Sequence, residues 1–227
     1  FGMLGRTSRL KVFAPECYAS LFEQQMNFFM QGMTYEIEFV PVDTTQQKVV
    51  YEDHSVTVET VPLRHRVPCC GYIFREKPTL PHIRRDMIDY YGIPLSQINN
   101  IKNGADWTTP EGDIVPNSRL VEPADAPRSY AYCSDTCYLP DLYERVKDVT
   151  VLYHESTYTS ENEDRAKIYY HSTARQAALV AQKAGAGRLL LGHYSARYNN
   201  ENVLLEEAKA VFPESYLAQE GMVFEVK

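Results

Sequence analysis

The sequence predicts an α/β fold in which a separate arm is inserted into a layered core, and three changes of pattern along the chain indicate this. Residues 1–75 hold one helix pattern and several strand patterns, residues 76–121 are repeatedly broken by proline, and residues 122–227 alternate strands with helices. Such alternation is typical of a layered α/β core. Hydrophobic residues make up 44% of the 227 residues, which suffices for a sizeable core.

The first region is predicted to be β-rich. The apolar run Leu10–Ala14 indicates a buried strand that stops at Pro15, and residues 16–31 carry apolar side chains at helical spacing. Strand patterns follow at Tyr35–Val40, Lys48–Glu52, Ser55–Val61 and Cys70–Arg75. Alternation of apolar and polar residues within Ser55–Val61 favours a sheet with one buried face.

The middle region lacks long strand patterns and carries prolines at positions 78, 81, 94, 110 and 116. Short helices are predicted at His82–Tyr91 and Ser96–Ile101. We therefore expect an inserted arm rather than a part of the core.

The last region is predicted to be the second α/β half of the molecule. Its expected strands are Ser129–Cys133, Thr150–His154, Arg188–Leu191 and Met222–Val226, and its expected helices are Leu139–Val146, Thr173–Ala184 and Asn200–Phe212. Gly185 follows the second helix as a usual helix stop, and Asn200 is the expected cap of the third.

Charge and cysteine content limit the function classes. The net charge of −7 argues mildly against nucleic acid as a partner, although a local basic patch matters more than the sum. The odd count of five cysteines indicates reduced thiols rather than a disulfide framework. No apolar run approaches 18 residues and no secretory signal is visible, so we expect a cytoplasmic protein without a membrane span.

Three potential ligands for a metal follow strand patterns. Asp135 follows YAYCS, His154 follows VTVLY, and His193 follows RLLLG. Layered α/β proteins place their sites where strands end, so Asp135 and His193 are expected to converge, together with His65. Imidazole and carboxylate form a suitable zinc-binding set. Each residue alone is more often a cap, turn or surface residue, and spacing alone supports only an α/β protein with a candidate hydrolase site.

Several motifs together resemble ribonuclease Z, a family of the metallo-β-lactamase superfamily. The block HSTARQAALVAQKAGAGRLLLGHYSARY, His171–Tyr198, resembles the family's C-terminal block. HESTY from His154 resembles the HEAT motif with Ser156 in place of alanine, and YCSDT resembles GDT with Ser134 in place of glycine. PLRHRVPCCGYIFREK resembles the segment that carries another metal histidine. The resemblance implies a metallo-β-lactamase-like αββα sandwich.

The resemblance also implies a metal set. Family members hold two Zn²⁺ per complete active site, and matching positions imply His65 and His193 as terminal ligands and Asp135 as the bridge. The family's HxHxDH motif does not occur in the 227 residues, and FGMLGRTSRLKVFAPE resembles the stretch that follows it. We therefore expect that an N-terminal part is missing from this chain. The chain alone would then be unable to complete a two-zinc site.

The implied chemistry is cleavage of a phosphodiester by a metal-activated water. His171 matches the family's candidate acid for the leaving 3′-oxygen, and Glu155 matches the carboxylate that orients it. Carboxylate contact raises the pKa of a histidine and fixes its tautomer. The alternative for Glu155 is an ordinary loop salt bridge.

Substrate-binding positions are implied in the same way. Ser172, Thr173, Ser195 and Arg197 match positions near the phosphate. Ser172 or Thr173 could equally cap the following helix, and Arg197 could equally form a surface ion pair.

The insert that begins at Glu76 corresponds to the family's tRNA-gripping arm, with Arg84, Arg85 and Lys102 as phosphate contacts. The alternative is a solvated helical hairpin. The resemblance thus implies a zinc-dependent endoribonuclease that removes the 3′ trailer of precursor tRNA, usually as a homodimer. The alternatives are another phosphodiesterase of this fold, or an inactive fragment that only binds RNA or a partner.

Overall fold

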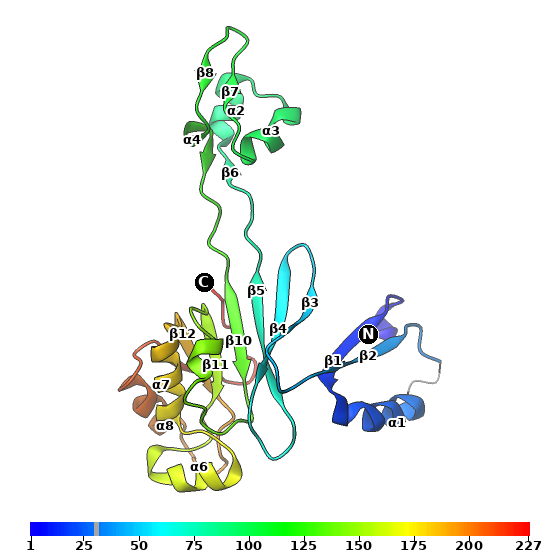
Figure 1. The fold of residues 1–227 in the computed structure, drawn as a ribbon, viewed down its shortest axis with the longest axis vertical. Coiled ribbons are helices and arrows are strands. Elements are labelled where there is room, and N and C mark those ends of the chain that lie inside the picture. The colour runs from blue at the N-terminus through cyan, green and yellow to red at the C-terminus, as the bar shows by residue number, and fades with distance from the viewer. Residues whose placement is uncertain (30–31) are drawn as a thin grey trace. The chain divides into compact units, whose positions relative to one another are not determined.

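The computed structural model describes residues 1–29 and 32–227 (Figure 1). Internal contacts divide them into two compact units, one made of residues 1–75 and 128–227 and the other of residues 76–127. The arm unit therefore begins at the predicted residue and ends six residues later than the predicted boundary at 121 (127 − 121). The functional division into three segments stays a prediction.

A seven-stranded sheet is the centre of the larger unit, in the order β13-β12-β11-β10-β5-β4-β3. These strands are β3 (Val49–Glu52), β4 (Val56–Pro62), β5 (Cys70–Glu76), β10 (Ser129–Cys133), β11 (Val151–Glu155), β12 (Arg188–Gly192) and β13 (Ser215–Leu217). Strands β10 to β13 pair in parallel, whereas β5 runs antiparallel to β10. The loops that follow β10, β11 and β12 therefore open at the same edge of the sheet.

The packed core lies between this sheet and helix α7 (Ala174–Ala184), with α8 (Asn202–Lys209) and α5 (Leu142–Arg145) beside α7. Ala177, Ala178 and Ala181 are completely buried on α7. Their small side chains let the helix lie close to Leu152 and Leu189 of the sheet, which are also completely buried. Thr173 caps this helix through a capping box with Gln176, and Gly185 ends it in the left-handed conformation.

A smaller parallel pair precedes the sheet, formed by β1 (Leu10–Pro15) and β2 (Ile37–Val42). The predicted helix over residues 16–31 begins as a 3-10 turn, η2 (Glu16–Tyr18), and continues as α1 (Ala19–Phe29). The last two predicted residues, Met30 and Gln31, lie outside the described residues. The described part of α1 buries none of its side chains.

The arm unit has a small core of its own. Its elements are β6 (His82–Ile83), α2 (Arg85–Tyr91), α3 (Leu95–Lys102), β7 (Trp107–Thr108), β8 (Ile114–Val115), α4 (Asn117–Leu120) and β9 (Val121–Glu122). Strand β6 pairs with β9, and β7 pairs with β8. Ile93, Ile101, Val115 and Leu120 are buried together. The arm is therefore a folded unit and not an extended loop.

The predicted strand Met222–Val226 is wrong, because the described tail has no regular structure there. Its carbonyl groups bond to side chains instead of a strand, and Arg188 donates to Glu225 O and Lys227 O. The sheet edge is taken by β13, which the sequence analysis missed.

Other local features also differ from prediction or were missed. The predicted helix from Asn200 begins at Asn202, whose N–H donates to Asn200 Oδ1. Helix α6 (Glu163–Tyr169), with the turn η3 (Ser160–Asn162) before it, was also missed. Among residues 1–29 and 32–227, no helix combines the length and apolar character that a membrane span requires.

Candidate active site

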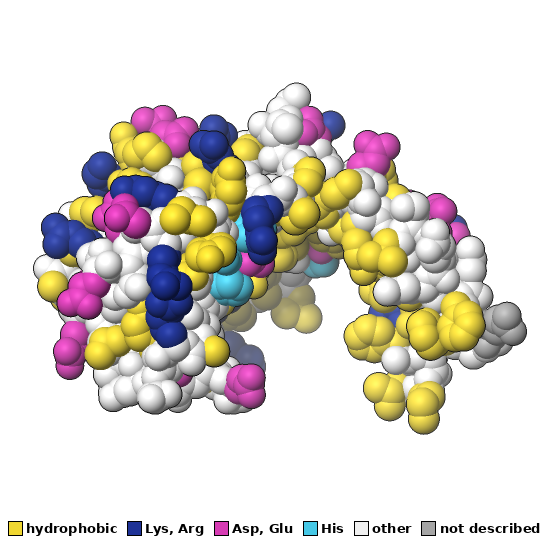
Figure 2. Space-filling view, turned by 90° about the horizontal axis from the view of Figure 1, so that it is seen from below, with side chains coloured by type: hydrophobic (Ala, Val, Ile, Leu, Met, Phe, Trp, Pro, Cys, Tyr) yellow, Lys and Arg dark blue, Asp and Glu magenta, His cyan; other side chains and the backbone are white. Residues whose placement is uncertain are grey.

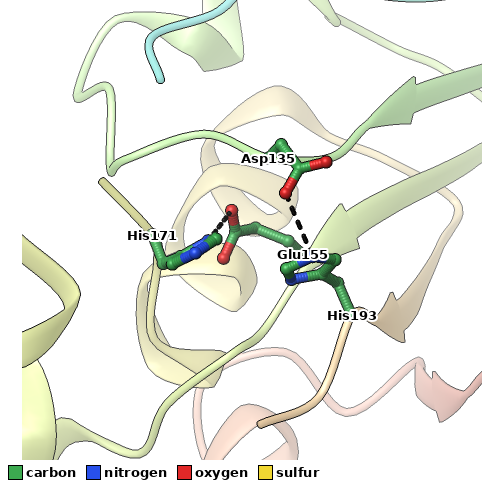
Figure 3. Close-up of side chains that lie close together, drawn as sticks. All are labelled: Asp135, Glu155, His171 and His193. Atoms are coloured by element: carbon green, nitrogen blue, oxygen red, sulfur yellow. Dashed lines mark hydrogen bonds and ion pairs between the residues drawn. The ribbon is translucent and has the colours of Figure 1, made fainter. Parts of the chain in front are cut away.

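Four acidic and histidine side chains meet at the sheet edge where the parallel strands end (Figure 3). Asp135 follows β10, Glu155 is the last residue of β11, and His193 follows β12. His171 lies between α6 and α7. Because Glu155 pairs in register with Gly192, the residue after it, His193, is carried to the same edge. One potential ligand atom from each of the four residues lies within 4.8 Å of the others.

The Glu155 carboxylate is completely buried and receives four hydrogen bonds. Its Oε1 accepts from Thr136 N at 2.6 Å and lies 3.0 Å from His171 Nδ1. Its Oε2 accepts from Thr157 Oγ1 at 2.7 Å and from Ser172 N at 2.9 Å. A carboxylate has about four acceptor positions, so none remains for a metal ion. Glu155 is therefore a positioning residue and not a metal ligand.

The hydrogen bonds of the buried Glu155–His171 pair favour an ionised Glu155 beside a protonated His171. Burial by itself raises the pKa of Glu155, but hydrogen bonds from His171, Thr157 and Ser172 outweigh it and lower the pKa. The hydrogen bond to Glu155 raises the pKa of His171 against its own partial burial. A loop salt bridge is exposed and adaptable. Complete burial of Glu155 therefore disfavours that alternative.

Asp135 and His193 form the open end of the site. Asp135 Oδ1 lies 3.0 Å from His193 Nε2, and the two side chains are 50% and 38% exposed, respectively. His193 Nδ1 lies 2.8 Å from Thr157 Oγ1, whose single proton goes to the Glu155 carboxylate. The hydroxyl therefore accepts from His193 Nδ1–H. When Nε2 carries no proton, its lone pair faces the Asp135 carboxylate, which is repulsive unless a cation lies beside both groups.

His65 is oriented by a backbone carbonyl. Its Nδ1 lies 3.0 Å from Tyr170 O, which can only accept, so Nδ1 carries the proton and Nε2 is left for a ligand. The His65 ring centroid lies 5.1 Å from that of His171, which lies 5.1 Å from that of His193. Tyr170 adopts the left-handed backbone conformation, with φ of 60°. The predicted ligands His65, Asp135 and His193 therefore gather around His171.

Asp135 and His193 belong to the group of side chains that could hold a metal ion, whereas His65 lies outside that group and stays a predicted ligand. Two imidazole nitrogens and one carboxylate oxygen form a frequent zinc donor set. Each histidine uses Nδ1 for a hydrogen bond within the protein, which leaves Nε2 as the donor toward a metal. His171 differs, because the hydrogen bond to Glu155 raises its pKa, and a proton at Nε2 competes with a metal ion for that nitrogen.

The predicted substrate contacts lie in two different settings. Ser172 and Thr173 are completely buried. The Ser172 hydroxyl donates to Thr136 O, and Thr173 caps α7, so the capping alternative holds for Thr173. Arg197 is exposed, with its guanidinium 5.1 Å from the Tyr158 ring centroid and 3.2 Å from Ser195 Oγ. Phosphate contacts by these four residues stay predictions. Burial of Ser172 and Thr173 argues against such contacts by their side chains.

The arm residues belong to the other compact unit. Arg84 forms an ion pair with Asp86 at 2.8 Å, and Arg85 lies 3.8 Å from Asp89. Lys102 is in the last turn of α3. Their role in RNA binding stays a prediction.

Sequence reasoning missed Thr136, Thr157 and Tyr170 as supporting residues. Their contributions are a backbone N–H, a hydroxyl and a backbone carbonyl, which have no motif of their own. Thr157 is the fourth residue of the motif HEST, His154–Thr157, and this position was the only sequence signal for its role. His154 of the same motif is fully buried, which lowers its pKa, and is thus a core histidine.

Solved structures establish the class of this fold. The chain is similar to the metallo-β-lactamase fold protein YhfI from Bacillus subtilis, with a TM-score of 0.59, 17% identity and coverage of 97% of this chain and 67% of that one. It is similar to the short form of human tRNase Z, with a TM-score of 0.59, 17% identity and coverage of 99% and 70%. The protein therefore has a metallo-β-lactamase fold.

Sequence relatives define the family more narrowly. The chain is 49% identical over 222 residues to a ribonuclease Z of Bacteroides fragilis, covering 98% of this chain and 73% of the relative. It is 47% identical over 227 residues to a ribonuclease Z of Phocaeicola vulgatus, covering 100% and 74%. No family model matches the chain. On these similarities, the chain belongs to the ribonuclease Z family, as its motifs predict.

Proposed function

We propose that this protein is a zinc-dependent endoribonuclease that removes the 3′ trailer of precursor tRNA and leaves a 3′-hydroxyl. Membership in the ribonuclease Z family supports the reaction class. The observation that carries the chemistry is the buried Glu155–His171 pair beside Asp135 and His193. It combines a proton donor with metal-binding groups, which hydrolysis of a phosphodiester requires.

His171 is the proposed general acid. When water attacks phosphorus, the bond from phosphorus to the 3′-oxygen breaks, and that oxygen needs a proton. The proton on His171 Nε2 supplies it, because Glu155 occupies the Nδ1 side of the ring. Glu155 remains ionised throughout, since three further hydrogen bonds hold its carboxylate. The neutral imidazole then regains a proton from water.

Asp135, His65 and His193 are the proposed metal-binding residues of this chain. Bound divalent ions lower the pKa of water and screen the phosphate charge. Two Zn²⁺ per complete active site remain part of the proposal, with Asp135 as the shared ligand. The proposed partners are precursor tRNA, gripped by the arm residues Arg84, Arg85 and Lys102, and a second copy of the chain. We propose the cytoplasm as its location, consistent with five free cysteines.

The test uses the protein expressed from its natural gene and a precursor tRNA with a labelled 3′ trailer. We expect one cut that yields a tRNA with a 3′-hydroxyl and a trailer with a 5′-phosphate, loss of cutting in EDTA, and recovery with Zn²⁺. His171→Asn should retain bound metal and lose most of the cutting rate, since it cannot act as an acid.

Hydrolysis of bis(p-nitrophenyl) phosphate without any cutting of precursor tRNA would instead identify a phosphodiesterase for small substrates. RNA binding without hydrolysis of either substrate would identify a protein that only binds RNA. Either result would contradict the proposal.

A further inference from the structure

A cavity of about 350 Å³ opens beside His171, within the larger unit. Its lining includes Arg64, Tyr138, Lys167, Tyr170 and Gln176, and His171 forms part of its wall. None of the five has a role in the metal or acid chemistry, apart from the backbone carbonyl of Tyr170. This volume falls within the range of pockets that hold small organic ligands.

The lining suits a nucleobase. The Arg64 guanidinium lies 5.9 Å from the centroid of the Tyr170 ring, and Tyr138 adds a second aromatic ring. Unpaired RNA bases stack on aromatic rings and on guanidinium groups. Gln176 Oε1 already accepts from Thr173 N, so its amide N–H groups remain as donors for a base.

The charge of the cavity suits RNA as well. Lys167 is neutralised by Glu163, with Nζ and Oε1 2.9 Å apart. Arg64 has no carboxylate at ion-pair distance among the described residues, so its charge is available to a phosphate or a base. Figure 2 shows histidine side chains at the surface of one face with Lys and Arg side chains beside them.

The position of His171 decides which nucleotide reaches the cavity. This inference rests on the proposed function, in which His171 gives its proton to the leaving 3′-oxygen. That oxygen belongs to the ribose of the nucleotide on the 5′ side of the cut, so this ribose must lie within hydrogen-bond reach of His171. We propose that the cavity binds the base of this nucleotide, the last one of the processed tRNA, by stacking against Arg64 and Tyr170.

Equilibrium binding tests the proposal without requiring cleavage. The probe is a fluorescent processed tRNA whose last nucleotide carries either its base or no base, and the readout is anisotropy with the natural protein. Loss of the base should weaken binding roughly tenfold, the size expected for one stacked base. Arg64→Gln and Tyr170→Asn should weaken binding of the normal RNA and remove the difference between the two RNAs. Asparagine tolerates the left-handed backbone at position 170.

Arg165→Gln is the matched control. Glu163, Lys167 and Tyr170 line the cavity at helical spacing, whereas Arg165 lies on the same helix, is exposed and does not line it. The control removes the same charge and should bind both RNAs as the wild type does. Equal binding of the two RNAs by wild type, or an undiminished difference in the Arg64 and Tyr170 variants, would overturn the proposal.

A cleavage assay separates this inference from the proposed function. Absence of cutting on any precursor tRNA contradicts the function, whereas the binding experiment still reports on the cavity. A precursor that lacks the base of its first trailer nucleotide should be cut as well as the normal one. A loss confined to that substrate would assign the cavity to the trailer and refute the proposal.

Discussion

Glu155 and Asp135 lie at the ends of neighbouring parallel strands and carry the same chemical group, yet their surroundings are opposite. Glu155 is completely buried and holds four hydrogen bonds. The Asp135 side chain is half exposed, and it forms an ion pair with His193. Glu155 is still inside β11, whereas Asp135 lies two residues beyond β10. A carboxylate saturated by hydrogen-bond donors thus orients its neighbours, whereas an unsaturated carboxylate is left for a metal.

Asp135→Asn should have the largest effect on activity. The amide keeps the shape and suits the left-handed backbone but loses the anionic ligand, so we expect a thousandfold or greater loss of kcat/KM, on the order of the several kcal/mol that a metal supplies. Stability without metal should change by less than about 0.5 kcal/mol, because the side chain is half exposed. Kinetics and thermal melts in EDTA measure the two quantities. A large loss of stability in EDTA would contradict the assigned role.

Glu155→Gln should reduce both activity and stability. The NH₂ group of the new glutamine would face hydrogen-bond donors that now bind the Glu155 carboxylate. The free energy of unfolding should therefore fall by about 1–3 kcal/mol. Activity should fall roughly a hundredfold, within the range for a general acid that is no longer oriented. Denaturant unfolding and kinetics check the pair of effects.

Ser156→Ala, at the neighbouring buried residue, is the control for Glu155→Gln. Ser156 Oγ donates to Gly192 O, which also accepts from Ser156 N, so the carbonyl stays bonded in the variant. This change should cost less than about 1 kcal/mol and leave activity near wild type. Equal effects of the two variants would contradict the distinction between them.

Thr157→Val should weaken metal binding about 10- to 100-fold, the usual effect of removing a group that orients a ligand. The Thr157 hydroxyl donates to the Glu155 carboxylate and accepts from His193 Nδ1. It therefore connects the buried carboxylate to the histidine that is paired with Asp135. Thr157→Ser keeps the hydroxyl and should bind Zn²⁺ nearly as wild type in calorimetric titrations. Equal weakening by both variants would mean that the methyl group, and not the hydroxyl, is needed.

The alkaline limb of the pH–rate profile should move to lower pH in Glu155→Gln. Glu155 raises the pKa of His171 in the folded protein, so the acid form persists above the ordinary value. The stability that this raised pKa contributes is complete below about pH 6.5 and is lost as pH rises through the folded pKa. Removing the carboxylate lowers the pKa again. An unchanged alkaline limb would argue that another group donates the proton.

Much of the second half of the fold could be predicted from local pattern, and the rest could not. Alanine spacing and Gly185 predict α7 almost to the residue. Strand β13 has only three residues, which is too short for periodicity to reveal, and α6 buries a single residue, Ala166. The tail fails as a strand because its carbonyls bond to Arg188.

The site depended more on family resemblance than on spacing. His65 and Asp135 are distant in sequence; the ends of the strand patterns suggested that they converge, but only the matching motifs assigned both as metal ligands. The role of Thr157 exists only once β11 and β12 lie side by side, so that His193 Nδ1 reaches its hydroxyl. No local pattern encodes that contact.

The left-handed backbone at Asp135, with φ of 55°, sets folding against activity at this position. Glycine adopts this conformation without steric penalty, whereas aspartate adopts it at a small penalty, lower than that of most residues with a side chain. A mutational scan scored for folding alone should therefore enrich glycine at position 135, and the same scan scored for RNA cleavage should eliminate it. Aspartate at this position therefore costs stability relative to glycine, so variants selected only for thermal tolerance should lose their enzymatic activity here first.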